Sequence, residues 1–380
     1  MKFLHISDLH LGKRLNEFSL IEDQAFILNQ ICDCIKVEKT NALLIAGDIY
    51  DKGIPSVEAV NLFDGFLNNL AELKCEVFII SGNHDSSDRL VCGSKLMENS
   101  GVHFARTYDG NVKPYVLQDS NGPVNIYLLP FIKPAVVKSV FPDDAETISS
   151  YTDAVKCAIS HMNVNTTERN ILVAHQFVTG STRSDSEDIS VGGSDNVDAQ
   201  VFSSFDYVAL GHLHGPQKAG SEIIRYCGTP LKYSFSETAH KKSMLIINIE
   251  KKGDIQFSTI PFKPLHDLRE IRGTYEELTF KKNYENTAVE DYLHITLTDE
   301  DDIPEGFAKL QVIYPNLVKL DYDNKRTRTN NEIEAELDVE HTSPIDLFEG
   351  FFKLQNNSEL SDEQKSFTQK LIEDIWGGEK

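Results

Sequence analysis

Short apolar runs that each end in polar side chains recur through residues 1–214 of the chain. The run Leu43–Ala46 is followed by Gly47 and Asp48, a pattern typical of a buried parallel strand with a carboxylate at its C-terminal end. The same pattern occurs at residues 3–10, 77–85, 171–175 and 207–214. Open α/β sheets bind ligands at the carboxyl ends of their strands, so these segments predict one binding site at that edge.

Between these strands the apolar positions follow a helical period. The segment after the first strand is apolar at i, i+3, i+4 and i+7, which predicts a helix that covers the sheet: Leu28, Ile31, Cys32 and Ile35. A second helix, predicted from Ser56 to about Leu73, has two apolar stripes: Val60, Phe63, Leu67 and Leu70 form one, and Leu62, Phe66 and Leu73 form the other. Such a helix is either buried on both sides or contributes one side to a dimer interface.

The pattern also predicts the elements that follow. We expect a helix capped by Ser86–Asp88 that ends near Glu98, strands within residues 102–131, and a helix near residues 151–162. Antiparallel strands are expected at residues 225–230, 244–249 and 255–260. The Ser-, Asp- and Gly-rich residues 180–196 predict a loop that overhangs the site, because this segment lies between two strand ends.

Phe262–Pro264 is the best linker candidate in the sequence. We therefore expect an α/β domain over residues 1–264, a smaller α+β domain over residues 265–335, and C-terminal helices over residues 336–380. The smaller domain has strand-like runs at residues 293–297 and 318–320, and Ser361–Gln364 predicts a capping box at the start of the last helix.

Composition narrows the class of protein without deciding its function. The chain has 380 residues, of which 40% are hydrophobic, enough for two or three domains with a sizeable core. Its net charge of -22 argues against a generally basic nucleic-acid binder but leaves a nuclease possible, because part of the acidic excess can face metal cations.

The chain has no feature of a membrane or secreted protein. No apolar run approaches the roughly 18 residues that a membrane span needs, and residues 1–10 lack the apolar core of a signal peptide. The six cysteines show no paired zinc spacing and indicate reduced structural thiols rather than disulfides. We expect a soluble, cytoplasmic protein.

The strand ends supply seven oxygen and nitrogen donors: Asp8, His10, Asp48, Asn83, His175, His212 and His214. Seven such donors are enough for two divalent ions that share one carboxylate, for which Asp48 is the candidate. Imidazole ligands favour Mn²⁺, Fe²⁺ or Zn²⁺ over Mg²⁺. His84, next to Asn83, is better placed over a substrate as a general acid, with Asp85 as the candidate that orients its ring.

A single motif of this kind would mean little. An isolated D-x-H or G-D at a strand end is usually structural, whereas G-N-H-D and G-H-x-H are more specific. All five motifs in this order point to a dinuclear metal site with phosphoesterase chemistry. The remaining histidines lack ligand-like neighbours and are expected to be structural: His5, His103, His161, His240, His266, His294 and His341.

These motifs resemble the signature of the calcineurin-like metallophosphoesterase superfamily and, more closely, of the nuclease subunits of bacterial SbcC–SbcD complexes. The resemblance rests on residues 5–12, 46–51, 82–86, 209–214 and 225–231, and it is strong over residues 1–260. It implies a two-sheet α/β sandwich, with a smaller α+β capping domain and a helical C-terminal tail.

The resemblance also implies roles for individual residues. One metal ion would take Asp8, His10, Asp48 and His214, and the other would take Asp48, Asn83, His175 and His212, with Mn²⁺ as the expected metal. The capping domain would meet DNA, and the C-terminal helices would bind an SbcC-type coiled-coil ATPase in a heterotetramer of two plus two chains. The alternative for those helices is packing on the chain's own body.

Three functions compete at this stage. The first is a DNA exonuclease and endonuclease subunit of DNA repair and recombination. The second is a phosphatase or cyclic-nucleotide phosphodiesterase that uses the same metal site. The third is a non-catalytic scaffold, which would typically have lost ligands. For DNA, the expected contacts are sequence-independent and come from basic residues such as Lys325, Arg326 and Arg328.

Overall fold

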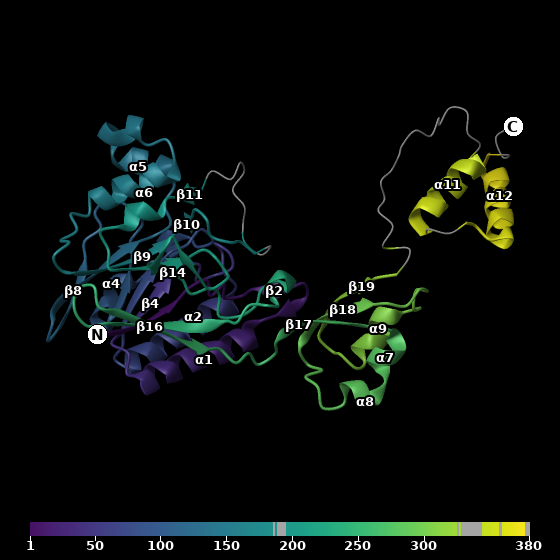
Figure 1. Cartoon of the computed structure of the whole chain (residues 1–380), viewed down its shortest axis with the longest axis horizontal. Coiled ribbons are helices and arrows are strands. Elements are labelled where there is room, and N and C mark those ends of the chain that lie inside the picture. Colours follow the sequence, from purple (N-terminus) through teal and green to yellow (C-terminus); the bar gives the residue numbers. More distant parts are fainter. Residues whose placement is uncertain (185–186, 188–194, 325–326, 328–343, 357–358, 377–380) are drawn as a thin grey trace. The chain divides into compact units, whose positions relative to one another are not determined.

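The structure is a computed structural model, and it describes residues 1–184, 187, 195–324, 327, 344–356 and 359–376 (Figure 1). Two compact units are present, Met1–Leu268 and Arg269–Lys380. The first unit therefore ends four residues after the expected linker, whose last residue is Pro264. The expected boundary between residues 335 and 336 lies outside the described residues, as do Lys325, Arg326 and Arg328.

The first unit is built from two six-stranded sheets. The first sheet has the order β16 (Ile255–Pro261), β15 (Ser243–Ile249), β1 (Lys2–Ile6), β4 (Ala42–Ala46), β5 (Glu76–Ile80) and β6 (Val102–Phe104). The second has the order β13 (Gln217–Ala219), β14 (Ser221–Tyr226), β12 (Tyr207–Gly211), β9 (Arg169–His175), β8 (Gly122–Leu129) and β7 (Tyr115–Asp119). The two-sheet α/β sandwich expected from the resemblance is confirmed.

The strands that carry the predicted ligands are central and parallel in both sheets. In the first sheet β4 lies between β1 and β5, and Leu44 is paired with His5 on one side and Phe78 on the other. In the second sheet β9 and β12 are parallel neighbours, with Gly211 opposite His175. Parallel pairing aligns the carboxyl ends of these strands, so each sheet presents its ligand residues along one edge.

Apolar side chains from both sheets form one core between them. Its members have at most 9% of their surface exposed and include Phe3, Leu44 and Phe78 from the first sheet and Ile171 and Tyr207 from the second. Strands buried on both faces need apolar residues at every position, which explains their continuous rather than alternating runs. Burial of this kind contributes about 25 cal/mol for each Å² of apolar surface removed from water.

Helices flank the sandwich on its two outer sides. Figure 1 shows α1 (Ile21–Glu38) and α2 (Val57–Glu72) on one side and α5 (Pro134–Val140) and α6 (Tyr151–Ser160) on the other. The hydroxyl of Ser56 caps α2 by accepting a hydrogen bond from the amide of Ala59. A capping box between Ser150 and Asp153 begins α6. The predicted helices after the first strand, after Ser56 and near residues 151–162 are confirmed.

Two predictions of local structure were wrong. The helix expected to end near Glu98 is broken into α3 (Ser87–Leu90), α4 (Ser94–Met97) and the 3-10 turn η1 (Glu98–Ser100). Gly93 interrupts it with a φ of +78°, a left-handed conformation that a continuous helix cannot contain. Strand β14 was expected in an antiparallel group, but it pairs in parallel with β12 and antiparallel only with β13.

The remaining elements of the first unit are short: β2 (Arg14–Leu15), β3 (Phe18–Ser19), β10 (Phe177–Val178), β11 (Asn196–Val197), η2 (Pro142–Thr147), η3 (Ala199–Phe202) and η4 (Phe235–Glu237). All six cysteines are free thiols, as expected. Among the described residues, no helix combines the length and apolar character needed to cross a membrane.

The second unit contains a small sheet with the order β17 (Leu268–Gly273), β18 (Tyr292–Leu297) and β19 (Leu317–Tyr322). Its helices are α7 (Tyr275–Thr279), α8 (Lys281–Tyr284), α9 (Gly306–Gln311), α11 (Pro344–Asn356) and α12 (Asp362–Trp376). Leu293, Ile295, Leu310 and Leu317 are fully buried in its core. The predicted capping box is present, because Gln364 donates its amide to Ser361 Oγ and accepts from the Ser361 amide.

Candidate metal centre

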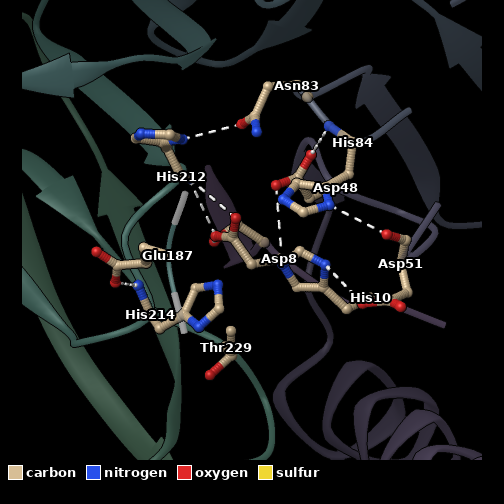
Figure 2. A network of polar contacts seen from close by, with 12 residues as sticks. Asp8, His10, Asp48, Asp51, Asn83, His84, Glu187, His212, His214 and Thr229 are labelled. Carbon is tan, nitrogen blue, oxygen red and sulfur yellow. Dashed lines mark hydrogen bonds and ion pairs between the residues drawn. The ribbon is translucent and has the colours of Figure 1, made fainter. Parts of the chain in front are cut away.

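Residues from five strand ends meet where the two sheets approach each other (Figure 2). Asp8 follows β1, Asp48 follows β4 and Asn83 follows β5, whereas His175 ends β9 and His212 and His214 follow β12. The backbone amide of His212 donates to both carboxylate oxygens of Asp8, at 3.0 and 3.2 Å. The carboxylate of the first sheet is thereby tied to the backbone of the second, and all seven predicted donors come together.

Four of these residues have a backbone conformation that side-chain-bearing residues seldom adopt. Their φ angles are +53° for Asp8, +43° for His10, +50° for Asp48 and +104° for His212. Left-handed backbone at a non-glycine residue costs roughly 1–3 kcal/mol and persists only where surrounding contacts impose it. The amides of Asp8 and His10 donate to the carbonyls of Gly47 and Asp48, at 3.0 Å each, and these bonds hold the two strand ends together.

Gly82 lets two neighbouring strand ends of the first sheet approach each other closely, and Gly211 does the same between the two sheets. A Cβ atom on Gly82 would overlap the carboxylate of Asp48, and one on Gly211 would overlap the carbonyl oxygen of Ala46. The same Cβ on Gly211 would lie 2.8 Å from Nδ1 of His175. A side chain at either position would push the ligand residues apart, which is the physical reason for glycine in the G-N-H-D and G-H-x-H motifs.

Asp48 lies between two groups of possible ligands. Its Oδ2 atom is 3.7 Å from Nε2 of His10 and 3.3 Å from Nε2 of His175. Its Oδ1 atom accepts a hydrogen bond from the backbone amide of His84 at 2.9 Å, which fixes the plane of the carboxylate. This position matches that expected of a carboxylate shared by two ions.

The first group consists of Asp8, His10 and His214, whose ligand atoms lie within 4.8 Å of one another. His10 is 1% exposed, and neither ring nitrogen makes a hydrogen bond among the described residues. Burying a polar nitrogen without a partner is costly. A divalent cation between Asp8, Asp48 and the ring of His10 would give a ring nitrogen of His10 a binding partner. These residues therefore fit a metal ion.

The second group is built around the ring of His175. Its Nδ1–H donates to the carbonyl oxygen of Ala46 at 2.8 Å, so in the neutral ring Nε2 carries a lone pair. That Nε2 faces Oδ2 of Asp48 at 3.3 Å and Oδ1 of Asn83 at 3.0 Å, and Nδ1 of His212 lies 3.0 Å from the same Asn83 oxygen. Acceptors that converge in this way repel one another unless a proton or a cation lies between them.

The charges of the site show the same demand for a cation. Burial lowers the pKa of His175, but the carboxylates of Asp48 and Asp8 and the carbonyl of Ala46 together outweigh this effect and raise that pKa to about 9. Burial raises the pKa of Asp48, but the rings of His175, His10 and His84 together reverse this effect, so that the pKa of Asp48 lies below its ordinary range. Burial raises the pKa of Asp8 to about 6 and lowers that of His212 to about 3. The raised pKa of His175 indicates that the carboxylates of Asp48 and Asp8 attract positive charge to this position.

Asp85, which was expected to orient the ring of His84, contacts the backbone of the neighbouring strand ends. Its carboxylate accepts from the backbone amides of Ile49, Tyr50 and Gly82 at 2.9–3.1 Å, and it thereby joins the ends of β4 and β5. The ring of His84 instead places Nδ1 3.0 Å from the carbonyl oxygen of Asp51. A carbonyl accepts only, so Nδ1–H of His84 is the donor in this contact.

Several residues of the site were missed at the level of the sequence. Glu237 is fully buried and accepts from Nδ1–H of His214 at 3.1 Å, and Lys242 donates to Glu237 at 2.6 Å and to the carbonyl oxygen of His214 at 2.8 Å. A carboxylate on the far nitrogen of a ligand histidine is a common device for fixing its tautomer and orientation. Neither residue belongs to a recognisable motif, so only their placement finds them.

The loop expected to overhang the site is described in part. Glu187 accepts a hydrogen bond from the backbone amide of His214 at 2.6 Å, so this residue does reach the site (Figure 2). The Arg183 guanidinium carbon lies 3.7 Å from the centroid of the Phe177 ring. Residues 185–186 and 188–194 of this loop are outside the described part of the chain.

Comparison with known proteins is consistent with this geometry. Residues 1–216 match the family described as calcineurin-like phosphoesterase, and residues 264–356 match the family described as type 5 capsule protein repressor C-terminal domain. The chain is 34% identical to a Staphylococcus epidermidis protein named as the SbcD component of the nuclease SbcCD, with 98% of each chain covered. It is 33% identical to a protein of the same name from Staphylococcus saprophyticus, again with 98% of each chain covered.

Proposed function

The chain belongs to the calcineurin-like phosphoesterases and, within them, to the SbcD nucleases, and from this membership we propose that it cuts DNA as both exonuclease and endonuclease. Double strands would be the exonuclease substrate, and single strands and hairpins the endonuclease substrate. It is a metal-dependent nuclease subunit, and its hydrolysis of phosphodiesters would serve DNA repair and recombination.

One observation carries the proposal. Oδ2 of Asp48 lies within 3.7 Å of imidazole nitrogens of both His10 and His175, with Asp8 and His214 beside the first ring and Asn83 and His212 beside the second. The seven side chains would hold two divalent ions, with Mn²⁺ as the expected metal because imidazole ligands disfavour Mg²⁺. When bound, such a pair supplies the positive charge that polarises a phosphodiester and acidifies a water molecule.

The chain's own residues supply the proton for the leaving group. His84 is half-buried beside His10, with the ring centroids 4.8 Å apart, and its amide is bonded to Asp48. Because the carbonyl oxygen of Asp51 holds Nδ1–H, a protonated ring presents Nε2–H towards the phosphate position. Transfer of that proton to the departing oxygen leaves a neutral alcohol, and the ring remains in its Nδ1–H tautomer.

A test compares the purified chain with His84→Ala and Asp48→Asn in the presence of Mn²⁺. We expect His84→Ala to retain metal, measured by metal analysis, and to lose about 10²–10⁴-fold in the rate of cleavage of linear and hairpin DNA. Asp48→Asn should lose both metal and activity. Full DNA cleavage by His84→Ala would refute its role as general acid. Rapid turnover of small phosphoesters without DNA cleavage would favour a phosphatase or cyclic-nucleotide phosphodiesterase.

Aromatic rings and cations beside the second group support a nucleic acid as substrate. The ring of Phe131 lies 6.4 Å from that of His212 and nearly parallel to it, and Phe177 is also 6.4 Å from His212. Lys133 lies over Phe131 and Arg183 over Phe177, at 6.0 and 3.7 Å from the ring centroids. Single strands are commonly bound by aromatic rings that stack on bases and by cations that contact phosphates, neither of which depends on sequence.

Exposed apolar residues supply surfaces for the proposed partners. Ile54, Val57 and Val60, at the start of α2, are 73%, 72% and 42% exposed, which supports a homodimer formed through this helix. Phe351 and Phe367, in α11 and α12, are 58% and 71% exposed and would bind a coiled-coil ATPase of the SbcC type. Two copies of each chain would form the cytoplasmic complex.

A further inference from the structure

We propose that Asp144, Cys157 and His161 form a third metal site, separate from the dinuclear centre, for a thiophilic divalent cation of the Zn²⁺ class. Asp144 lies in η2, and Cys157 lies on α6, whose C-cap residue is His161. None of the three belongs to the strand ends that carry the seven donors described above. The motifs of the sequence do not include them, and His161 was expected to be structural.

The spacing on α6 brings two of the ligands to one face. Cys157 and His161 are four residues apart, and the amide of His161 still donates to the carbonyl oxygen of Cys157 at 3.3 Å. Residues four apart on a helix lie one above the other, so the thiol and the imidazole point to the same side. Asp144 completes the group from η2, and one ligand atom from each residue lies within 4.8 Å of the others.

Two of the three distances between the ligand atoms are close to those of a tetrahedral site. Oδ2 of Asp144 is 3.0 Å from Nε2 of His161 and 3.7 Å from Sγ of Cys157. For Zn–N and Zn–O distances of about 2.0–2.1 Å and a Zn–S distance of about 2.3 Å, tetrahedral geometry separates N from O by about 3.4 Å and S from O by about 3.6 Å. These two distances therefore differ from the tetrahedral values by a few tenths of an ångström or less, and the third, between the sulfur and the imidazole nitrogen, is below 4.8 Å.

The imidazole is already held in position. The ring of His161 stacks on that of Phe141, with the centroids 3.9 Å apart and the planes within 8°. A ligand whose orientation is fixed before binding loses less conformational entropy on coordination. Phe141 immediately precedes η2, so the same short segment supplies both the stacking ring and the carboxylate.

The donor set selects the class of metal. A thiolate, an imidazole and a carboxylate suit Zn²⁺ and its softer analogue Cd²⁺ better than Mg²⁺ or Ca²⁺, which prefer oxygen ligands alone. Burial and then the carboxylate of Asp144 raise the pKa of Cys157, so the thiol keeps its proton in the absence of a cation, and coordination would release that proton. Three protein ligands leave the fourth position for water. The bound ion would fasten η2 to the C-terminal end of α6.

Cadmium offers a selective test, because a cadmium–thiolate bond absorbs in the ultraviolet and the seven donors of the dinuclear centre include no sulfur. The reduced full-length chain is titrated with Cd²⁺ and the charge-transfer absorbance is followed. We expect a band that saturates with one equivalent of cadmium at the thiolate and is reversed by excess Zn²⁺. We expect Cys157→Ser to abolish it and Cys92→Ser, a change at an exposed cysteine, to leave it unchanged.

His161→Ala distinguishes a site made by three ligands from cadmium binding by the thiol of Cys157 alone. We expect this variant to keep the band but to weaken Cd²⁺ binding at least about tenfold, the smallest loss that removal of a supporting group at a metal site usually produces. Circular dichroism of each variant verifies its folding. The proposal is overturned if wild-type protein gives no band, if the band survives Cys157→Ser, or if His161→Ala binds Cd²⁺ as tightly as wild type.

Discussion

Asp48 illustrates how single side chains of this protein serve both fold and site. Its Oδ1 atom holds the backbone of His84, and its Oδ2 atom faces the rings of His10 and His175. The carboxylate of Asp85 differs from that of Asp48, because both of its oxygens accept hydrogen bonds from backbone amides. The same carboxylate group is thus a candidate metal bridge in Asp48 and a structural hydrogen-bond acceptor in Asp85, because the surroundings of the two residues differ.

His5 makes stability depend on pH. It is fully buried, with Nδ1 2.8 Å from the hydroxyl oxygen of Tyr207, and burial lowers its pKa from 6.5 to about 3. Below the unfolded pKa only the unfolded chain takes up the proton, so stability is lost as pH falls from 6.5 towards 3. In metal-free urea unfolding, we expect wild type to lose up to ~1.4 kcal/mol per pH unit more than His5→Gln. Equal slopes would contradict this.

Lys133 and Arg183 are predicted to contact phosphate groups of DNA. Removal of one phosphate contact lowers the slope of log affinity against log salt by about one. We therefore expect Lys133→Ala and Arg183→Gln each to weaken binding of single-stranded DNA and to lower this slope by about one. Lys138→Ala, a change at an exposed lysine of α5, is the matched control and should alter neither quantity. Unchanged slopes for Lys133 and Arg183 would exclude them from the interface.

At the scale of elements, the position of the site is set by the ends of the strands and not by the helices that flank the sheets. The parallel pairs β1–β4–β5 and β9–β12 bring five strand ends to the meeting edge of two sheets. The left-handed backbone of Asp8, His10 and Asp48 turns their side chains into the gap. Long-range hydrogen bonds, such as that from His212 to Asp8, connect the two edges.

Gly211 tests this arrangement. Gly211→Ala would place a methyl group against the carbonyl of Ala46 and the ring of His175. We expect a loss of at least ~1–3 kcal/mol in the free energy of unfolding, together with weaker binding of Mn²⁺. Gly65→Ala is the matched control, because Gly65 lies exposed on α2 with no atom near the added Cβ. There the change should stabilise the protein by ~0.5–1 kcal/mol, measured by urea unfolding. Equal effects would refute the steric argument.

On the scale of the whole molecule, the chain divides into a catalytic unit and a second unit, with all seven predicted metal ligands in Met1–Leu268. The net charge of -22 is therefore compatible with DNA only if local cations and bound metal ions offset it. Exposed apolar side chains at the start of α2 and on α11 and α12 identify the surfaces expected to meet other chains.

The dimer prediction concerns α2. Val57→Glu adds a charge to a side chain that is 72% exposed, so the fold should tolerate it while an apolar interface would not. We expect wild type to sediment as a dimer and Val57→Glu as a folded monomer. The change Val37→Glu, at a 77% exposed position on α1, should leave the dimer intact. A dimer that survives Val57→Glu would exclude this surface.

The prediction for the C-terminal helices concerns the ATPase. Phe351→Glu and Phe367→Glu together should abolish capture by an SbcC-type ATPase, because both side chains are more than half exposed and apolar. Val312→Glu, at an 86% exposed position of the second unit, is the control and should bind as wild type does. Metal-dependent hydrolysis of a small phosphodiester should persist in every variant. If the double variant still binds the ATPase normally, these helices do not form the binding surface and instead pack on the chain's own body.

The sequence alone predicted the five strands that end at the site, the order of their motifs and the seven candidate donors, because apolar runs and the residues that end them are local features. Tertiary structure decided the partners: Asp85 with the amide of Ile49, 36 residues away, and Glu237 with His214, 23 residues away. Such pairs depend on sheet register and on how closely the two sheets pack, and a local sequence pattern predicts neither of these. For the same reason Asp144, Cys157 and His161 become a group only once η2 folds against α6.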